Sequence, residues 1–142
     1  MEWYLKVFKQ YADFSGRARR KEYWIFTLVN ALIVGVFEVF FFALSFPAYT
    51  SSSSSSSSGS NVFTIISLLF SCVVAIYGLA ALIPSLAVTV RRLHDTGRSG
   101  WYYFIALVPF VGGLILLVFT IEDSQPGINA YGPNPKETPA AF

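Results

Sequence analysis

Three long apolar stretches, separated by short polar segments, dominate the pattern of hydrophobic and polar positions. Residues 23–46 contain a single charged residue, and residues 62–90 and 101–121 contain none. At about 1.5 Å per residue, an α-helix over each stretch is long enough to cross a hydrocarbon core of about 30 Å. The pattern therefore predicts an all-α integral membrane protein with three transmembrane helices, built as a single membrane domain over residues 1–142.

The third stretch is the least regular, because Pro109 and the pair Gly112 and Gly113 interrupt it. Two arrangements fit this pattern, one kinked helix or a re-entrant hairpin of two short halves. Irregular backbone at membrane depth must be buried in protein or face water. We therefore favour one kinked helix over residues 101–121 and keep the hairpin as the alternative.

The first 22 residues form an amphipathic and basic segment. Over residues 1–14, apolar and charged positions recur at steps of three and four on opposite sides, which is typical of a helix. We expect this helix to lie in the membrane interface, and the alternative is that its apolar face packs against the protein's own helices. The apolar face comprises Trp3, Tyr4, Val7, Phe8, Tyr11 and Phe14, and the charged face comprises Glu2, Lys6, Lys9 and Asp13.

The polar segments between and after the apolar stretches differ in character. Residues 47–61 include eight consecutive serines, which predicts a flexible outer loop. Residues 91–100 form a short basic connector, and residues 122–142 form a tail rich in proline, glycine and asparagine. We expect the tail to be a surface segment filled with turns.

Small and hydroxyl residues recur about once per helical turn within residues 62–90. Such a stripe lets helices approach closely in a membrane, where packing and hydrogen bonds drive association. We expect it to be a packing face within the chain, with a homodimer face as the alternative. The stripe comprises Ser67, Ser71, Ala75, Gly78, Ala81, Ser85 and Thr89.

Composition and charge narrow the class of protein further. Of the 142 residues, 54% are hydrophobic and 13% are charged, about half the charged share of a typical globular domain. This excludes an ordinary soluble domain and an intrinsically disordered chain.

The distribution of basic residues predicts the orientation in the membrane. Of the ten lysines and arginines, six precede the first stretch, three lie in the connector and one lies in the tail. The excess of basic residues places the N-terminus and the connector in the cytoplasm. Three spans would put the tail outside, whereas a hairpin would return it to the cytoplasm.

Three separated motifs carry a resemblance to a known family. They are WYLKVFKQYADFSGRARRKEYW near the N-terminus, RRLHDTGRSGWYY in the middle and PGINAYGPNP in the tail. In this order around apolar stretches, they resemble the family called domain of unknown function 805. The resemblance implies a small multi-pass protein of the bacterial cytoplasmic (inner) membrane and implies no activity. The serine-rich loop departs from the short connector that is usual in this family.

Six basic residues border the first two apolar stretches at one expected membrane level. If the second helix continues through the connector, Arg91 and Asp95 lie four residues apart and can form an ion pair. Arginine matches phosphate geometry through two parallel hydrogen bonds. We therefore expect a non-enzymatic module that binds anionic phospholipid, or a membrane partner protein, through this face. The alternative is that these residues only set orientation and brace the connector. The six are Arg17, Arg20, Lys21, Arg91, Arg92 and Arg98.

The remaining polar residues offer weaker candidates for chemistry. His94 and Asp95 are interpreted as a structural polar cluster, and a catalytic role for them is the third possibility, since no nucleophile or further metal ligand is suitably spaced. Inside the first apolar stretch, Asn30 and Glu38 are intramembrane polar residues. They support an alternative function as a small transporter or channel subunit. We expect no cofactor, no metal, no nucleic-acid partner and no enzymatic activity, and we leave open a homo-oligomer.

Overall fold

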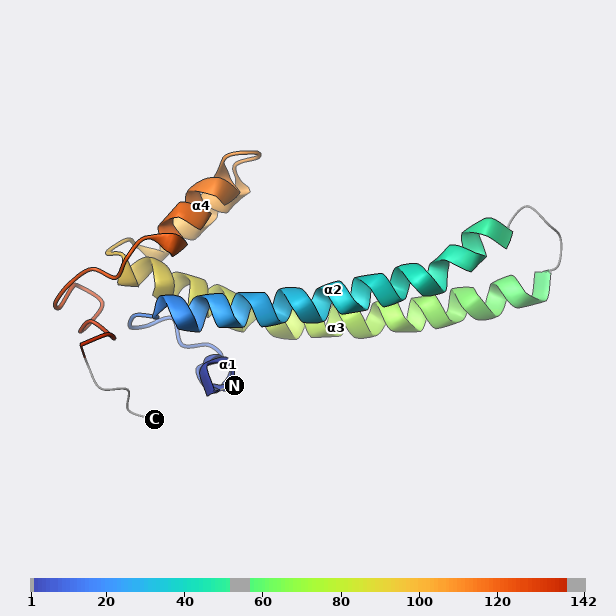
Figure 1. The fold of residues 1–142 in the computed structure, drawn as a ribbon, viewed down its shortest axis with the longest axis horizontal. Coiled ribbons are helices and arrows are strands. Elements are labelled where there is room, and N and C mark those ends of the chain that lie inside the picture. The colour runs from blue at the N-terminus through green and yellow to red at the C-terminus, as the bar shows by residue number, and fades with distance from the viewer. Residues whose placement is uncertain (1, 52–56, 138–142) are drawn as a thin grey trace. The chain divides into compact units, whose positions relative to one another are not determined.

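The structure is a computed structural model that describes residues 2–51 and 57–137, and the described chain is helical throughout its regular elements. Helix α1 covers Glu2–Lys9, α2 covers Arg20–Ser51 and α3 covers Ser57–Asp95. A 3₁₀ helix, η1, follows over Gly100–Leu107, and α4 covers Gly112–Ile121 (Figure 1). The all-α prediction is confirmed.

The serine-rich region differs from its prediction at both borders. Helix α2 continues to Ser51 and α3 begins at Ser57, so helix replaces most of the loop predicted over residues 47–61. Each residue added to an existing helix gains a hydrogen bond without a new nucleus, which lets helices extend past their apolar stretch. The rest of the predicted tether, residues 52–56, lies outside the described residues.

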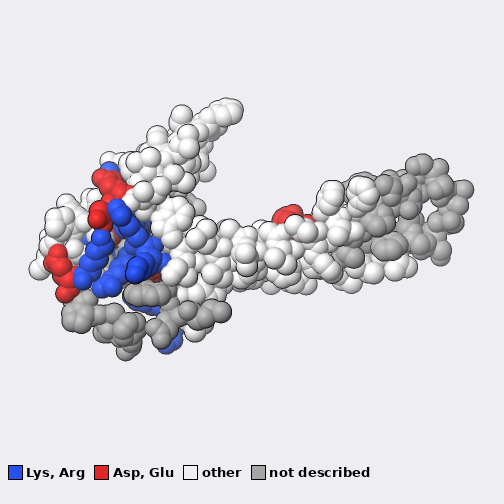
Figure 2. Space-filling model, viewed as in Figure 1, with Lys and Arg blue, Asp and Glu red and all other residues white. Residues whose placement is uncertain are grey.

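The chain divides into two compact units. The first, which we call the charged unit, contains residues 1–28 and 82–142, and the second, which we call the apolar unit, contains Val29–Ala81. All ten basic residues and seven of the eight acidic residues belong to the charged unit. Figure 2 shows basic and acidic side chains gathered over that unit. Glu38 is the only charged residue of the apolar unit.

In the apolar unit, parts of α2 and α3 pack side by side through aromatic rings. The ring of Phe70 on α3 lies 5.6 Å from Phe37 and 5.2 Å from Phe40, both on α2. Away from this seam, Val39 is 71% exposed and Leu79 is 70% exposed. Two helical segments, Arg20–Ala43 and Thr64–Asp95, are long and apolar enough to cross a membrane, with mean hydropathies of 2.3 and 2.5. Their apolar side chains are exposed rather than buried, which fits a lipid environment better than a protein core.

The stripe of small residues on α3 does not form the packing face in the apolar unit. Ala75 and Gly78 are exposed, and a Cβ atom at Gly78 would meet nothing within 4 Å. The expectation of a packing face within the chain is therefore wrong for this part of the stripe. The physical reason is that large rings, among them Phe70 and Tyr77, fill the seam instead.

The apolar face of the N-terminal helix packs against the protein. Val7 is fully buried, and it forms a core with Ala18, Phe26 and Val88. The rings of Tyr4 and Phe8 lie 5.5 Å and 5.8 Å from the ring of Phe26. For these residues the alternative of packing on the protein's own helices is confirmed. The helix ends at Lys9 rather than at residue 14.

Residues 101–121 do not form one kinked helix, so that expectation is wrong. Helices η1 and α4 fold back on each other (Figure 1), and the ring of Tyr102 lies 6.0 Å from that of Phe119. The chain turns through Phe110, whose φ angle is 66°. Pro109 has no N–H to continue a helix, and Gly112 lets the two arms touch, because a Cβ atom there would lie 2.0 Å from the Ile105 carbonyl oxygen. The structure shows two short halves in contact, as the hairpin alternative requires.

Candidate functional site: an arginine cluster in the charged unit

Arg17 joins the N-terminal segment to the connector and the tail. Its side chain is 1% exposed, and its Nε donates to the Asp95 carboxylate over 2.9 Å. Its Nη1 donates to the carbonyl oxygens of Gly127 and Gly132, and its Nη2 donates to those of Asp95 and Gln125. A planar guanidinium with five donors suits such a set of acceptors. Arg17 is therefore satisfied within the protein.

Arg92 holds the end of the hairpin. Its side chain is fully buried and pairs with Asp95, three residues further along α3. Its Nε donates to the carbonyl oxygen of Thr120 over 3.0 Å, and its Nη2 donates to that of Glu122. These carbonyls lie at the C-terminal end of α4, where a helix leaves acceptors unpaired and favours positive charge. Arg92 thus fixes the last turn of α4 against α3.

Arg91 has a different partner from the one predicted. Helix α3 does continue to Asp95, as that prediction required, but Arg91 pairs with Glu22 over 3.3 Å. Arg91 also donates to the side chain of Gln10. Both charged groups are nearly inaccessible, with side chains 3% and 1% exposed. The expected ion pair of Arg91 with Asp95 is therefore wrong, because Asp95 is occupied by Arg17 and Arg92.

The other three predicted basic residues lie at the surface. Arg20 is 40% exposed, donates to the carbonyl oxygen of Glu122 over 3.0 Å and lies 3.7 Å from Asp123. Arg98 is 26% exposed, pairs with Glu122 and lies 4.0 Å above the ring of Phe119. Lys21 is exposed in the first turn of α2. The six predicted residues thus divide into three that are buried and three that solvent reaches.

Two surface carboxylates of the charged unit are held in their ionised form. Hydrogen bonds from the Ser15 side chain and backbone lower the pKa of Asp13. The pKa of Asp123 is lowered by a hydrogen bond from Lys136 and another from the backbone of Ser124. A hydrogen bond to the charged form of a carboxylate favours that form. Both groups therefore remain negative at neutral pH.

His94 and Asp95 are neighbours in sequence but face different partners. The His94 ring stacks on Tyr131 of the tail, with ring centroids 3.8 Å apart and planes within 1°. The Asp95 carboxylate instead receives Arg17, Arg92 and the Ser124 hydroxyl. In residues 2–51 and 57–137, no three histidine, cysteine, aspartate or glutamate side chains lie close enough to hold a metal ion.

The family motif in the tail suggested that the tail docks against the body of the protein, but the sequence did not show what it binds. Its backbone carbonyls accept from Arg17, as described above, and the carbonyl of Pro135 accepts from Arg19. Gly127 and Gly132 have φ angles of 68° and 128°, which non-glycine residues rarely adopt. The only signal for this docking was the motif PGINAYGPNP, since backbone acceptors are not visible in a sequence. Glu22 was missed, although an acidic residue so close to an apolar stretch requires a partner.

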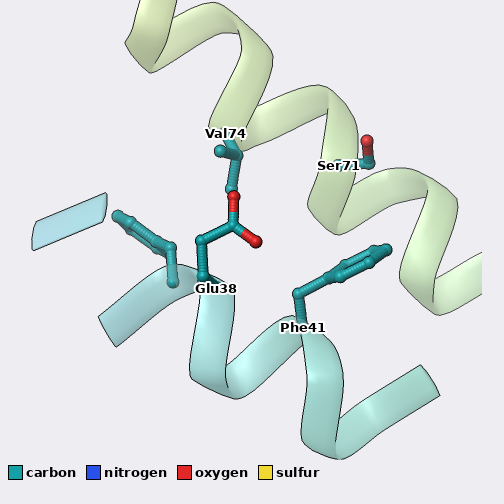
Figure 3. Close-up of a pocket in the computed structure, with 5 residues that line it drawn as sticks. Glu38, Phe41, Ser71 and Val74 are labelled. Carbon is teal, nitrogen blue, oxygen red and sulfur yellow. The ribbon is translucent and has the colours of Figure 1, made fainter. Parts of the chain in front are cut away.

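Glu38 belongs to a separate site in the apolar unit. It lines a pocket of about 100 Å³ together with Phe37, Phe41, Ser71 and Val74. Figure 3 shows its side chain extending from α2 toward α3, with the carboxylate beside Val74. Asn30 does not line this pocket, and its amide oxygen accepts from the Tyr77 hydroxyl over 2.6 Å.

Two long apolar helices, a short apolar hairpin and a charged unit tied together by buried arginines define a small helical membrane protein. The family model described as a protein of unknown function (DUF805) matches residues 11–133. The chain therefore belongs to the DUF805 family, and the family predicted from the sequence is confirmed.

Relatives in Escherichia coli (strain K12) agree with this assignment. The chain is 41% identical to inner membrane protein YhaH over 139 residues, which cover 98% of this chain and 100% of that protein. It is also 41% identical to inner membrane protein YhaI over 136 residues, which cover 96% of this chain and 97% of that protein. Uncharacterized protein YiiR is 32% identical over 99 residues, or 70% of this chain and 52% of that protein. No solved structure matches the chain. The inner-membrane location predicted from the sequence is supported by these relatives.

Proposed function

We propose that this protein is a non-enzymatic module of the inner membrane that binds anionic phospholipid headgroups through Arg20, Lys21 and Arg98. The observation that carries the proposal is the position of Arg20 and Lys21. Both lie in the first turn of α2, where Lys21 is exposed and the Arg20 side chain is 40% exposed, and only the buried Glu22 separates them from Tyr23 and Trp24. Tyrosine and tryptophan favour the level of the headgroups, so the two basic residues meet lipid phosphates at that level.

The buried arginines support this surface without contacting lipid. Arg17, Arg91 and Arg92 neutralise Glu22 and Asp95 inside the charged unit, so they hold together the segments that carry the exposed residues. With ten basic and seven acidic residues, the charged unit has a formal charge of +3. Each basic residue near an anionic membrane surface contributes about 1 kcal/mol to binding.

The proposed orientation places the charged unit in the cytoplasm. Nine of the ten basic residues precede the first apolar stretch or lie in the connector, which the positive-inside rule assigns to the cytoplasmic side. Because Arg17 and Arg19 bind backbone carbonyls of the tail, the tail is on the same side. Helices α2 and α3 then cross the membrane as a pair.

The N-terminal segment, which comprises α1 and the residues that follow it, adds a second contact with the interface. Although Tyr4, Val7 and Phe8 pack inward, Leu5 is 55% exposed, Tyr11 is 36% exposed and Phe14 is 39% exposed. These side chains lie in the same unit as the exposed basic residues. Apolar and basic groups together are typical of a segment that rests on an anionic membrane.

The experiment compares lipid binding by two triple variants. Arg20→Gln, Lys21→Gln and Arg98→Gln together remove three charges, whereas Arg20→Lys, Lys21→Arg and Arg98→Lys keep them. Binding of phosphatidylglycerol and of phosphatidylcholine to each purified protein is measured by native mass spectrometry. At about 1 kcal/mol per residue, we expect the glutamine variant to bind phosphatidylglycerol about 100-fold more weakly. Equal affinity of the two variants for phosphatidylglycerol would refute the proposal.

A second candidate function, transport, is favoured by one observation in the apolar unit. A carboxylate within a membrane span is costly to insert and is therefore by default a candidate functional group, and Glu38 is such a group. The sequence predicted Asn30 and Glu38 as the polar residues of a transport site. Because Asn30 accepts a hydrogen bond from Tyr77 instead of lining the pocket, Glu38 is the member of that pair that we retain as a candidate. Proton flux into vesicles that contain the protein or its Glu38→Gln variant tests this function, and the absence of flux from both proteins rejects it.

A further inference from the structure

The apolar hairpin of η1 and α4 has both ends fixed in the charged unit. Its first arm begins at Gly100, and Arg98 lies just before it, over the ring of Phe119 in the second arm. Its second arm ends at Ile121, where Arg92 donates hydrogen bonds to the carbonyl oxygens of Thr120 and Glu122. The chain therefore enters and leaves the hairpin at the level of the arginine cluster.

Both arms have about half the length of a membrane span. The eight residues of η1 rise about 2.0 Å each, and the ten residues of α4 rise about 1.5 Å each. Each arm is thus about 15 Å long, against a hydrocarbon core of about 30 Å. A hairpin of this length reaches from the headgroups to about the centre of the bilayer.

The hairpin surface is apolar on all sides except at its base. No charged residue occurs over residues 99–121. Leu107 is 78% exposed, Leu114 is 65% exposed and Phe110 at the tip is 97% exposed. Charge appears only at the base, where Arg98 pairs with Glu122. An apolar tip above a charged base matches the change from acyl chains to headgroups within one leaflet, and contiguous exposed apolar surface of this kind is typical of a site of membrane contact.

Three backbone N–H groups near the tip donate hydrogen bonds within the hairpin. The N–H groups of Val108, Val111 and Gly112 donate to the carbonyls of Ile105, Pro109 and Val108, over 2.9, 2.8 and 3.0 Å. Pro109 has no N–H group to satisfy. In hydrocarbon, backbone polar groups must find partners inside the protein, and these three N–H groups meet that requirement.

From these observations we infer that residues 100–121 enter the leaflet next to the arginine cluster, turn near the bilayer centre and return to the same side. The partner of this surface is the acyl chains of that single leaflet. This insertion does not depend on the proposed binding of headgroups. Naming the leaflet the cytoplasmic one depends on the proposed orientation.

Single-cysteine labelling in sealed vesicles tests the insertion. In the full-length protein, Cys72→Ser removes the native thiol, and Lys9→Cys, Phe110→Cys or Ile128→Cys adds one at an exposed position. A membrane-impermeant maleimide is added to right-side-out and to inverted vesicles. We expect positions 9 and 128 to react from the same side and position 110 to react only after detergent is added. Reaction of positions 9 and 128 from opposite sides, or of position 110 in intact vesicles, would overturn the inference.

A depth measurement separates insertion from a protein partner that covers the tip. A fluorophore on Phe110→Cys is quenched by lipids that carry a nitroxide at carbon 5 or carbon 12 of the acyl chain. We expect at least twofold stronger quenching by the deeper nitroxide. Stronger quenching by the shallow nitroxide, or no quenching by either, contradicts insertion to the bilayer centre. Neither measurement changes Arg20, Lys21 or Arg98. A result against insertion of the hairpin therefore leaves the proposed headgroup binding untouched, and the two proposals can fail separately.

Discussion

Replacement of Gly112 by alanine is the substitution whose effect the hairpin geometry defines most sharply. An ideal Cβ atom at this position lies 2.0 Å from the carbonyl oxygen of Ile105 and 3.0 Å from its carbonyl carbon. The optimal separation of non-bonded heavy atoms is about 3.5 Å or more, so the arms would have to separate by about 1.5 Å. Since the obstacle is backbone rather than a flexible side chain, no rotamer change relieves it.

Gly113 offers a matched control, because a Cβ atom there meets nothing within 4 Å. Both glycines lie in the first turn of α4, so the helix propensity that alanine adds over glycine is similar at the two positions and cancels in the comparison. Overpacking costs about 1–3 kcal/mol. We therefore expect Gly112→Ala to be less stable than Gly113→Ala by about 1–3 kcal/mol in the free energy of unfolding.

The assay is reversible unfolding of both variants in mixed micelles with increasing dodecyl sulfate, followed by circular dichroism. Labelling of Phe110→Cys in each background reports whether the hairpin keeps its place. If Gly112→Ala is as stable as Gly113→Ala, the two arms are not in contact at Ile105 and the hairpin geometry is wrong.

Three further predictions concern the charged unit. Arg17→Met breaks a buried ion pair and should lower the free energy of unfolding by about 3–5 kcal/mol, whereas the exposed Arg20→Met should cost about 1 kcal/mol or less; equal losses in the same dodecyl sulfate titration would contradict the burial of Arg17. Tyr131→Phe should keep the tail protected from protease, because the phenylalanine ring can still stack on His94, whereas Tyr131→Ala should expose the tail. Equal cleavage rates for the two variants would show that the stack does not hold the tail in place. Because the pKa of Asp13 is lowered in the folded protein, its contribution to stability is present above its ordinary pKa and is lost as the pH falls. Ser15→Ala should raise the pKa of Asp13 in an NMR titration of the carboxyl carbon, and an unchanged titration would exclude the serine side chain as the cause.

The pattern of apolar residues was sufficient to predict the helical class and two long apolar helices, but not the hairpin. Pro109 and Gly112 marked a break in residues 101–121, yet periodicity is the same for one kinked helix and for two halves that fold back. What decides between them is a contact between Ile105 and Gly112 and the binding of Arg92 to the far end of α4. Neither the contact nor the backbone acceptors are encoded in a local pattern.

The arginines show a similar limit. Their positions beside the apolar stretches were visible in the sequence. The need to orient the protein in the membrane explains such positions as well as a lipid-binding site does. Whether an arginine is buried depends on partners far along the chain, such as Asp95 and the tail carbonyls for Arg17. The resemblance showed that the three motifs belong to one family pattern, but it did not show that the segments carrying them are in contact. Sequence reasoning therefore found the members of the cluster but could not separate Arg17, Arg91 and Arg92 from the exposed residues.

The central claim is that exposed basic residues of the charged unit bind anionic lipid while buried arginines hold that unit together. The most direct test counts the phospholipids that remain with the protein when it is purified from its own membrane, by mass spectrometry of the intact complex. We predict that phosphatidylglycerol or cardiolipin remains on the natural protein and is absent from the variant with glutamine at positions 20, 21 and 98. Retention of the same anionic lipids by both proteins, with both folded, would contradict the account.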